Sequence, residues 1–148
     1  MLTLGQAIHN AIEMERSAEQ FYDTLAQRTP DGEVREFLLE MARQERGHVE
    51  AIEQFGQQLD SGKLPQRADA NMGGVEISPG WGDPQSTSFE QAIELAIEAE
   101  NNAALYYDAI SDFLDGDGAR FFQAMVEIEE QHARRLRQMM ERRETAPG

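Results

Sequence analysis

One short motif, Glu45-Arg46-Gly47-His48, places a carboxylate and an imidazole one helical turn apart in a stretch that is otherwise patterned for burial. The positions around it at alternating spacings of four and three fall on one face of a helix, the face that packs against other helices. That stripe consists of Val34, Leu38, Met41, Glu45, His48, Ile52, Phe55 and Leu59. An unpaired carboxylate buried on such a face costs several kcal/mol or becomes neutral. We therefore expect another part of the chain, or a bound group, to compensate Glu45.

Polar residues interrupt three further apolar stripes in the same way. The stripe at the start of the chain is Leu4, Ile8, Ala11, Glu15, Ala18, Tyr22 and Leu25. A later stripe is Phe89, Ile93, Ala96, Glu100, Ala103, Tyr107, Ile110 and Leu114, and the last is Phe122, Met125, Glu129, His132, Leu136 and Met139. Each stripe predicts a helix with one acidic position at its centre, and the last repeats the Glu-x-x-His motif.

These polar residues recur at fixed offsets, which indicates a duplicated helix pair. At an offset of 85 residues, the matches are Glu15 with Glu100 and Tyr22 with Tyr107. At an offset of 84 residues, they are Glu45 with Glu129 and His48 with His132. Repeats can arise from architecture alone, but architecture would favour leucine at buried positions. The recurrence therefore favours a shared chemical role.

Four carboxylates brought together in a core would repel one another and could not all ionise. Two divalent cations would supply the four positive charges that match them. We predict a dinuclear metal site with six ligands: Glu15, Glu45, His48, Glu100, Glu129 and His132. One Glu from each of two helices and a Glu-x-x-His from each of two more is the ligand set of ferritin-like di-iron and di-manganese proteins.

Tyr22 and Tyr107 lie two turns beyond Glu15 and Glu100 on the same helix faces. A buried tyrosine hydroxyl needs a hydrogen-bond acceptor. We predict that each hydroxyl supports catalysis by orienting a ligand carboxylate across the bundle.

Capping and turn signals divide the chain into helices. Capping boxes are predicted at two helix starts, by Thr3 with Gln6 and by Ser88 with Gln91. Turn sequences at 29–32 and 115–118 separate the helices of each pair. We expect helix pairs over about residues 3–59 and 88–143, in one all-α domain that forms a ferritin-like four-helix bundle.

The segment 60–87 is rich in Gly and Pro and has no helical period. Its roughly 28 residues are long enough to return along the bundle, so that the second and third helices run parallel. We expect Trp81 to pin this crossover to the bundle.

Composition excludes several classes of function. The net charge of −15 disfavours nucleic acids and anionic membrane surfaces. The absence of cysteine excludes disulfides, iron–sulfur clusters and thiol catalysis. The chain has no apolar run that could span a bilayer, and residues 1–6 do not resemble a secretory leader, so we expect a cytoplasmic protein.

The sequence resembles the rubrerythrin family of the ferritin-like superfamily. The resemblance rests on Ala-Ile-Glu-x-Glu followed by Tyr seven residues later in both odd helices, and on Glu-x-x-His in both even helices. It implies two irons, with Glu15 and Glu100 bridging or capping them, Glu45 and Glu129 as further carboxylates, and one histidine per metal. Two features depart from the family: there is no Cys-rich rubredoxin domain, and Ala103 and Ala104 stand where rubrerythrins tend to have another Glu.

We expect a non-haem di-iron redox protein. The resemblance implies that it reduces hydrogen peroxide or O₂ in oxidative-stress defence, with electrons from a separate donor. The alternatives are a ferroxidase or iron-handling role, a di-manganese or mixed iron–manganese catalase-like site, and a module that holds metal without turnover. We also expect a homodimer, in which the crossover would allow helix pairs to exchange between chains.

Overall fold

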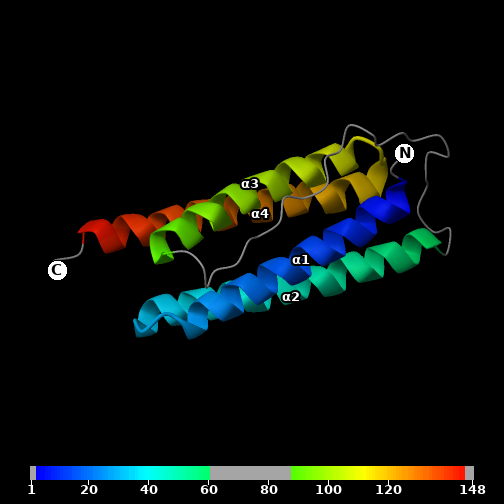
Figure 1. The fold of residues 1–148 in the computed structure, drawn as a ribbon. Helices are drawn as coiled ribbons and strands as arrows, with labels where there is room; N and C mark the ends of the chain where they lie inside the picture. Colours follow the sequence, from blue (N-terminus) through cyan, green and yellow to red (C-terminus); the bar gives the residue numbers. More distant parts are fainter. Residues whose placement is uncertain (1–2, 61–87, 146–148) are drawn as a thin grey trace.

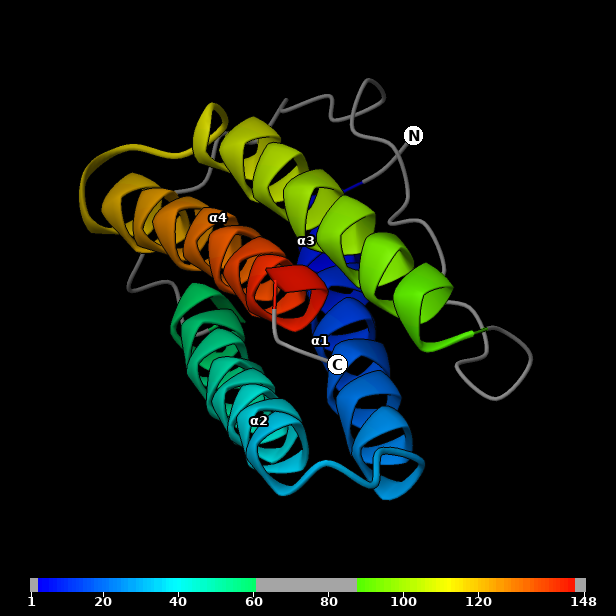
Figure 2. The same ribbon diagram turned by 90° about the vertical axis from the view of Figure 1, so that its left-hand side faces the viewer.

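The structure is a computed structural model that describes residues 3–60 and 88–145. The described residues form four helices, α1 (Leu4–Gln27), α2 (Gly32–Asp60), α3 (Phe89–Ser111) and α4 (Gly116–Thr145). Helices α1 and α2 form one antiparallel hairpin, and α3 and α4 form the other. The hairpins pack with α1 against α3 and α2 against α4 (Figures 1 and 2). The prediction of an all-α four-helix bundle is confirmed.

Helices α2 and α3 run parallel, although they follow each other in the chain. Figure 1 shows that α2 ends and α3 begins at opposite ends of the bundle. This is the geometry for which a long crossover was predicted. The crossover itself, 61–87, and with it Trp81, lies outside the described residues.

Both predicted capping boxes form. The Thr3 hydroxyl accepts a hydrogen bond from the Gln6 amide at 3.1 Å, and the Gln6 side chain accepts one from the Thr3 amide at 2.9 Å. Ser88 and Gln91 make the same reciprocal pair, at 3.2 Å in each direction. Each box satisfies amide groups that the first turn of a helix leaves without partners. The starts of α1 and α3 are therefore fixed locally.

The second half of the chain departs slightly from prediction. The apolar stripe that begins at Phe89 was expected to remain helical as far as Leu114, but α3 ends at Ser111. Leu114 is still buried, although it belongs to the connection that follows α3. The connection between α3 and α4 spans residues 112–115 rather than the predicted 115–118, because α4 already begins at Gly116. Gly116 takes a φ of 60°, which reverses the chain, and Asp117 then places a negative charge in the first turn of α4.

Two apolar clusters fill the bundle on either side of its centre. The first lies where α1 begins and α2 ends, and its members include Ile8, Ile52, Phe55, Ile110 and Phe122. The second lies at the opposite end and includes Leu25, Leu38, Met41, Ile93 and Leu136. On every helix, the predicted polar ligands fall between the residues of the two clusters. The apolar packing therefore sets the helix registers on both sides of the polar layer.

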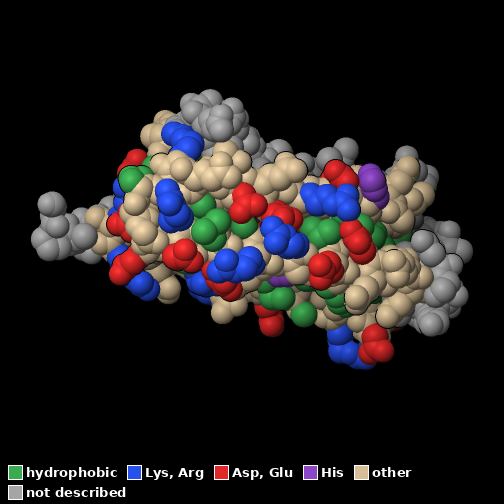
Figure 3. Space-filling model, turned by 90° about the horizontal axis from the view of Figure 1, so that it is seen from below, with side chains coloured by type: hydrophobic (Ala, Val, Ile, Leu, Met, Phe, Trp, Pro, Cys, Tyr) green, Lys and Arg blue, Asp and Glu red, His purple; other side chains and the backbone are tan. Residues whose placement is uncertain are grey.

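Charged residues outside the stripes face outward. Figure 3 shows acidic and basic side chains interspersed on one face of the bundle. Exposed acids off the stripes include Glu13, Glu98, Glu127 and Glu130, and His9 is exposed as well. In the described part of the chain, no helix has a stretch that is both long and apolar enough to cross a membrane.

The core assignment predicts unequal effects for two identical substitutions. Leu38 is 0% exposed in the second apolar cluster, whereas Leu105 is 69% exposed. We expect Leu38→Ala to lower the free energy of unfolding by about 2–5 kcal/mol, because it removes buried methyl groups and leaves a cavity. Leu105→Ala should change it by less than about 0.5 kcal/mol. Urea denaturation of the metal-free proteins measures both, and equal losses would contradict the assignment.

Candidate metal centre

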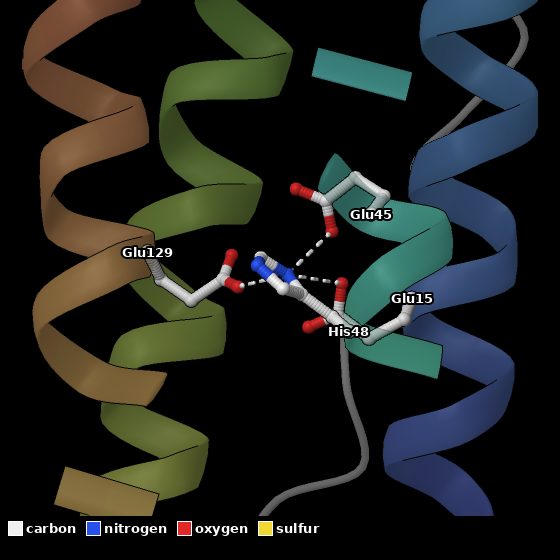
Figure 4. A group of neighbouring side chains, drawn as sticks. All are labelled: Glu15, Glu45, His48 and Glu129. Carbon is white, nitrogen blue, oxygen red and sulfur yellow. Dashed lines mark ion pairs between the residues drawn. The ribbon is translucent and has the colours of Figure 1, made fainter. Parts of the chain in front are cut away.

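The structure brings the six predicted ligand residues into one layer at the middle of the bundle. The layer contains Glu15 from α1, Glu45 and His48 from α2, Glu100 from α3, and Glu129 and His132 from α4. All are buried except His48, whose side chain is 13% exposed. Figure 4 shows four of them converging from three helices. The stripes therefore pointed to residues that meet in space.

The layer consists of two overlapping groups of potential ligands. One group is Glu15, Glu45, His48 and Glu129, and the other is Glu45, Glu100, Glu129 and His132. Within each group, one donor atom per residue lies within 4.8 Å of all the others. Glu45 and Glu129 belong to both groups, whereas each remaining residue belongs to one. The two groups exchange under the same pairing that relates the two halves of the sequence.

Each histidine directs Nδ1 at carboxylates. The Nδ1 atom of His48 lies 3.5 Å from Glu15 Oε2, 3.5 Å from Glu45 Oε2 and 3.4 Å from Glu129 Oε1 (Figure 4). The two imidazole rings stack, with centroids 5.5 Å apart and planes inclined by 17°.

The second histidine has a similar environment. Its Nδ1 atom lies 2.9 Å from Glu45 Oε1 and 3.6 Å from Glu100 Oε1. Glu45 therefore lies close to both rings.

Buried donor atoms in this layer lack hydrogen-bond partners. In the described part of the chain, the buried side-chain nitrogens and oxygens without a partner all belong to these six residues. They are Glu15 Oε2, both oxygens of Glu45, His48 Nδ1, Glu100 Oε2, Glu129 Oε1 and His132 Nδ1. Leaving such groups unpaired in a core is costly. Because all of them point into one layer, bound cations would satisfy them together.

The chemistry of these donors fits iron or manganese. Carboxylate oxygen and imidazole nitrogen suit both metals, and no thiolate is present that would select a softer ion. Ala103 and Ala104 are buried on α3, so no further carboxylate projects from α3 one turn beyond Glu100.

The tyrosines link the two hairpins reciprocally. The Tyr22 hydroxyl on α1 donates to Glu100 Oε1 on α3 at 2.7 Å, and the Tyr107 hydroxyl on α3 donates to Glu15 Oε1 on α1 at 2.6 Å. Both tyrosines are fully buried. Each bond occupies one oxygen of a carboxylate and leaves the other oxygen facing the layer, which is the orienting geometry expected from the sequence.

Burial and mutual repulsion make the carboxylates unequal. Burial raises the pKa of Glu45 well above its usual value, and the charges of Glu15 and Glu100 raise it further. The pKa of Glu129 is likewise raised, by burial and then by Glu100 and Glu15. Burial would also raise the pKa of Glu15, but interactions with Glu45, His48 and Tyr107 outweigh it and lower the pKa to about 2.

The histidines bind protons tightly when no metal is present. Burial would lower the pKa of His48, but Glu15 and Glu45 raise it to about 10. Burial acts in the same direction on His132, and Glu100 and Glu45 raise its pKa to about 9. In the metal-free protein, protons therefore supply part of the positive charge that the carboxylates require.

One residue beside the layer was not predicted from the sequence. The Nε2 atom of His132 lies 2.7 Å from Oε1 of Gln44, which is half-buried on α2. Gln44 lies next to the stripe rather than on it, so periodicity does not reveal it. The only signal in the sequence is a mismatch between the halves, because Ile128 occupies the matching position.

Comparisons with known proteins agree with this architecture. The family model for rubrerythrin matches residues 6–140. A Thermotoga maritima protein of known crystal structure, described as ferritin-like and diiron-carboxylate, is similar to this chain with a TM-score of 0.77 and 21% sequence identity. The match covers 93% of this chain and 94% of that one. A hypothetical protein from Pyrococcus furiosus has a TM-score of 0.76 and 22% identity, covering 95% and 89%. No curated protein matches the sequence. The expected ferritin-like fold is confirmed.

A tyrosine substitution tests the orienting contact. We expect Tyr107→Phe to weaken metal binding about 10-fold or more, because Glu15 loses the hydrogen bond that holds it. Tyr106→Phe is the matched control, since the Tyr106 hydroxyl donates instead to the Ala7 carbonyl at 2.9 Å. Both variants lose a buried hydrogen bond, but only the first should change the affinity for Zn²⁺ in a competition titration with a chelator. Equal affinities in the two variants would contradict the contact's role.

The pKa shifts of the histidines predict proton release on metal binding. At pH 7, His48 and His132 carry protons, because their pKa values are raised to about 10 and about 9. A metal-bound histidine must be neutral, so binding displaces these protons and tightens as pH rises from 7 towards 9. Calorimetric titration with Zn²⁺ in two buffers of different protonation enthalpy counts the protons. An apparent binding enthalpy that is the same in both buffers would show that none are released.

Proposed function

This chain belongs to the rubrerythrin family, and we propose that the centre of its bundle binds two iron ions and reduces hydrogen peroxide or O₂. The observation that supports the proposal most directly is the convergence, from all four helices into one layer, of buried nitrogen and oxygen atoms that make no hydrogen bond. Hydrophobic side chains would usually hold a bundle together at least as well as buried ionic groups do. Stability alone therefore gives no reason for this layer.

The ligand groups suggest how the ions would be held. Glu15 and His48 would bind one ion, and Glu100 and His132 the other. Glu45 and Glu129 occur in both groups and would be shared between the ions. In this arrangement, Glu15 and Glu100 would cap the two ions rather than bridge them. Two divalent ions would balance the four carboxylates.

When bound, a pair of ferrous ions supplies two electrons and a Lewis acid for the reduction of a small oxidant. The protein's part is to hold, orient and shield. Tyr22 and Tyr107 fix the outer carboxylates through short hydrogen bonds. The apolar clusters on both sides keep bulk water out of the layer. The exposed edge of His48 gives the layer its contact with solvent.

Electrons for repeated turnover would come from outside the chain. The sequence has no cysteine, so it holds neither a rubredoxin-type iron site nor an iron–sulfur cluster. The proposal therefore includes a separate electron donor. A homodimer, with or without exchange of helix pairs, also remains part of the proposal.

The same lack of cysteine supports a second candidate, a ferroxidase or iron-handling role. In that reaction Fe²⁺ is itself the reductant, so no donor is needed. The two functions differ in outcome: a ferroxidase consumes and releases iron over many turnovers, whereas a peroxidase retains its iron and is re-reduced. Manganese, alone or mixed with iron, remains a further alternative that metal analysis distinguishes.

Stoichiometric loading tests the proposed centre. Anaerobic titration with Fe²⁺ should saturate at two ions per chain, and peroxide should then oxidise both rapidly. We expect Glu129→Ala to bind fewer than two ions, because it removes a carboxylate common to both groups. Glu130→Ala is the matched control, since Glu130 is the next residue on α4 and is exposed. Metal analysis and absorbance spectroscopy provide the readouts.

Three results would contradict the proposal. Saturation at one ion per chain would exclude a dinuclear centre. Two bound ions that resist both peroxide and air would favour a module that holds metal without turnover. Full metal content in the Glu129→Ala variant would show that this layer is not where the metal binds.

A further inference from the structure

The two halves of the metal layer match in their ligands but differ around them. Beside His132 lie three polar residues that contact one another through Gln44: Glu40, Gln44 and Arg135. At the offset of 84 residues, their counterparts are Ala124, Ile128 and Ala51. One half therefore has a polar network where the other has only apolar side chains.

The network fixes which way the Gln44 amide points. Its Nε2 donates to Glu40 Oε1 at 3.2 Å, and Arg135 Nη1 donates to its Oε1 at 3.5 Å. Arg135 is itself held, with its guanidinium carbon 5.2 Å from the centre of the Phe37 ring. Both partners require the amide oxygen to face His132. The hydrogen bond donated to Glu40 and the one accepted from Arg135 therefore fix the orientation of the Gln44 amide.

This orientation selects one form of the His132 ring. Because Gln44 presents an acceptor at 2.7 Å, Nε2 of His132 carries hydrogen and donates. The neutral ring then has its lone pair on Nδ1, the atom that faces Glu45 and Glu100. Outer hydrogen bonds of this kind fix the tautomer and orientation of a metal-binding histidine.

His48 has no such support. Its Nδ1 faces three carboxylates, but no described residue accepts a hydrogen bond from its Nε2. Its side chain is 13% exposed, against 2% for His132. The ring is therefore free to take either tautomer and to exchange its outer hydrogen bond with solvent. A metal that binds there must fix the tautomer of a ring that is held through Nδ1 and by stacking on His132, but by no described group through Nε2.

We propose that the two metal positions are inequivalent, and that Gln44 is the positioning residue that makes them so. The position that includes Glu100 and His132 fills first, and the position that includes Glu15 and His48 fills second and loses its ion more readily. This inference rests on the metal binding put forward under the proposed function. It adds an order of filling and a residue, outside the ligand set, that determines it.

Histidine NMR tests the order directly. The chain has three histidines, so the ring signals of ¹⁵N-histidine-labelled protein are few, and exposed His9 serves as an internal reference. Zn²⁺ is added to half an equivalent per chain. In the wild type, we expect His132 Nδ1 to show the metal-bound shift while His48 remains largely unchanged. A preference of about 10- to 100-fold is the usual size for such outer contacts.

Three variants link the order to the hydrogen bond. Gln44→Met keeps the volume but removes the acceptor, so His48 and His132 should fill to similar extents. The double variant Glu40→Gln/Gln44→Glu exchanges carboxylate and amide, so it keeps an acceptor facing His132 and a hydrogen bond between positions 40 and 44, and it should retain the preference for His132. Gln54→Met is the matched control on an exposed position of α2, and it should behave as the wild type does. Circular dichroism verifies that each variant is folded.

The outcomes separate the two proposals. If no histidine shifts at any zinc concentration, the metal centre itself is wrong. If both histidines shift together in the wild type, or His48 shifts first, the metal centre stands but the inequivalence is overturned. If the preference for His132 survives in Gln44→Met, some other feature sets the order and Gln44 has no positioning role.

Discussion

Four carboxylates in the middle of an apolar bundle form the constraint on which the rest of this structure depends. Glu15, Glu45, Glu100 and Glu129 are at most 1% exposed, and burial together with the charges of Glu15 and Glu100 raises the pKa of both Glu45 and Glu129. Such a layer is tolerable only if positive charge enters it. Two divalent ions would provide that charge in full. Without them, the two histidines hold protons and compensate in part.

The apolar clusters determine that the carboxylates meet at all. Each helix contributes side chains to a cluster on either side of the polar layer, so packing fixes its register twice. A helix that slid along its axis would lose contacts in both clusters at once. The crossed hydrogen bonds from Tyr22 to Glu100 and from Tyr107 to Glu15 then tie the two hairpins together within the layer. Hydrophobic packing therefore sets the geometry of the ligands, and the tyrosines refine it.

Much of this was predictable from the sequence, because the information is periodic and local. Stripes with polar centres predicted the six residues that meet in the buried layer, and capping boxes located the starts of α1 and α3. The start of α4 at Gly116 was less accessible, since it depends on one backbone angle. The sharing of Glu45 and Glu129 between two groups could not be read from spacing, because all four carboxylates occupy equivalent stripe centres. Only the three-dimensional arrangement distinguishes them.

Gln44 is a residue that could not be predicted from the periodicity of the sequence. Its position also suggests how a duplicated protein acquires asymmetry. Its contact with His132 joins α2 to α4 across 88 residues, and Gln44 itself lies off the α2 stripe, so no periodic pattern includes it. Duplication gave the two halves the same carboxylates and histidines in this layer, and the charge balance of the layer resists changes to them. Residues just outside the layer are less constrained, because they are not part of the charged layer itself, although Ile128 packs against the first apolar cluster. Divergence there can distinguish two positions whose ligands are identical in kind. The polar network at His132 and the apolar side chains at the matching positions are a difference of this type.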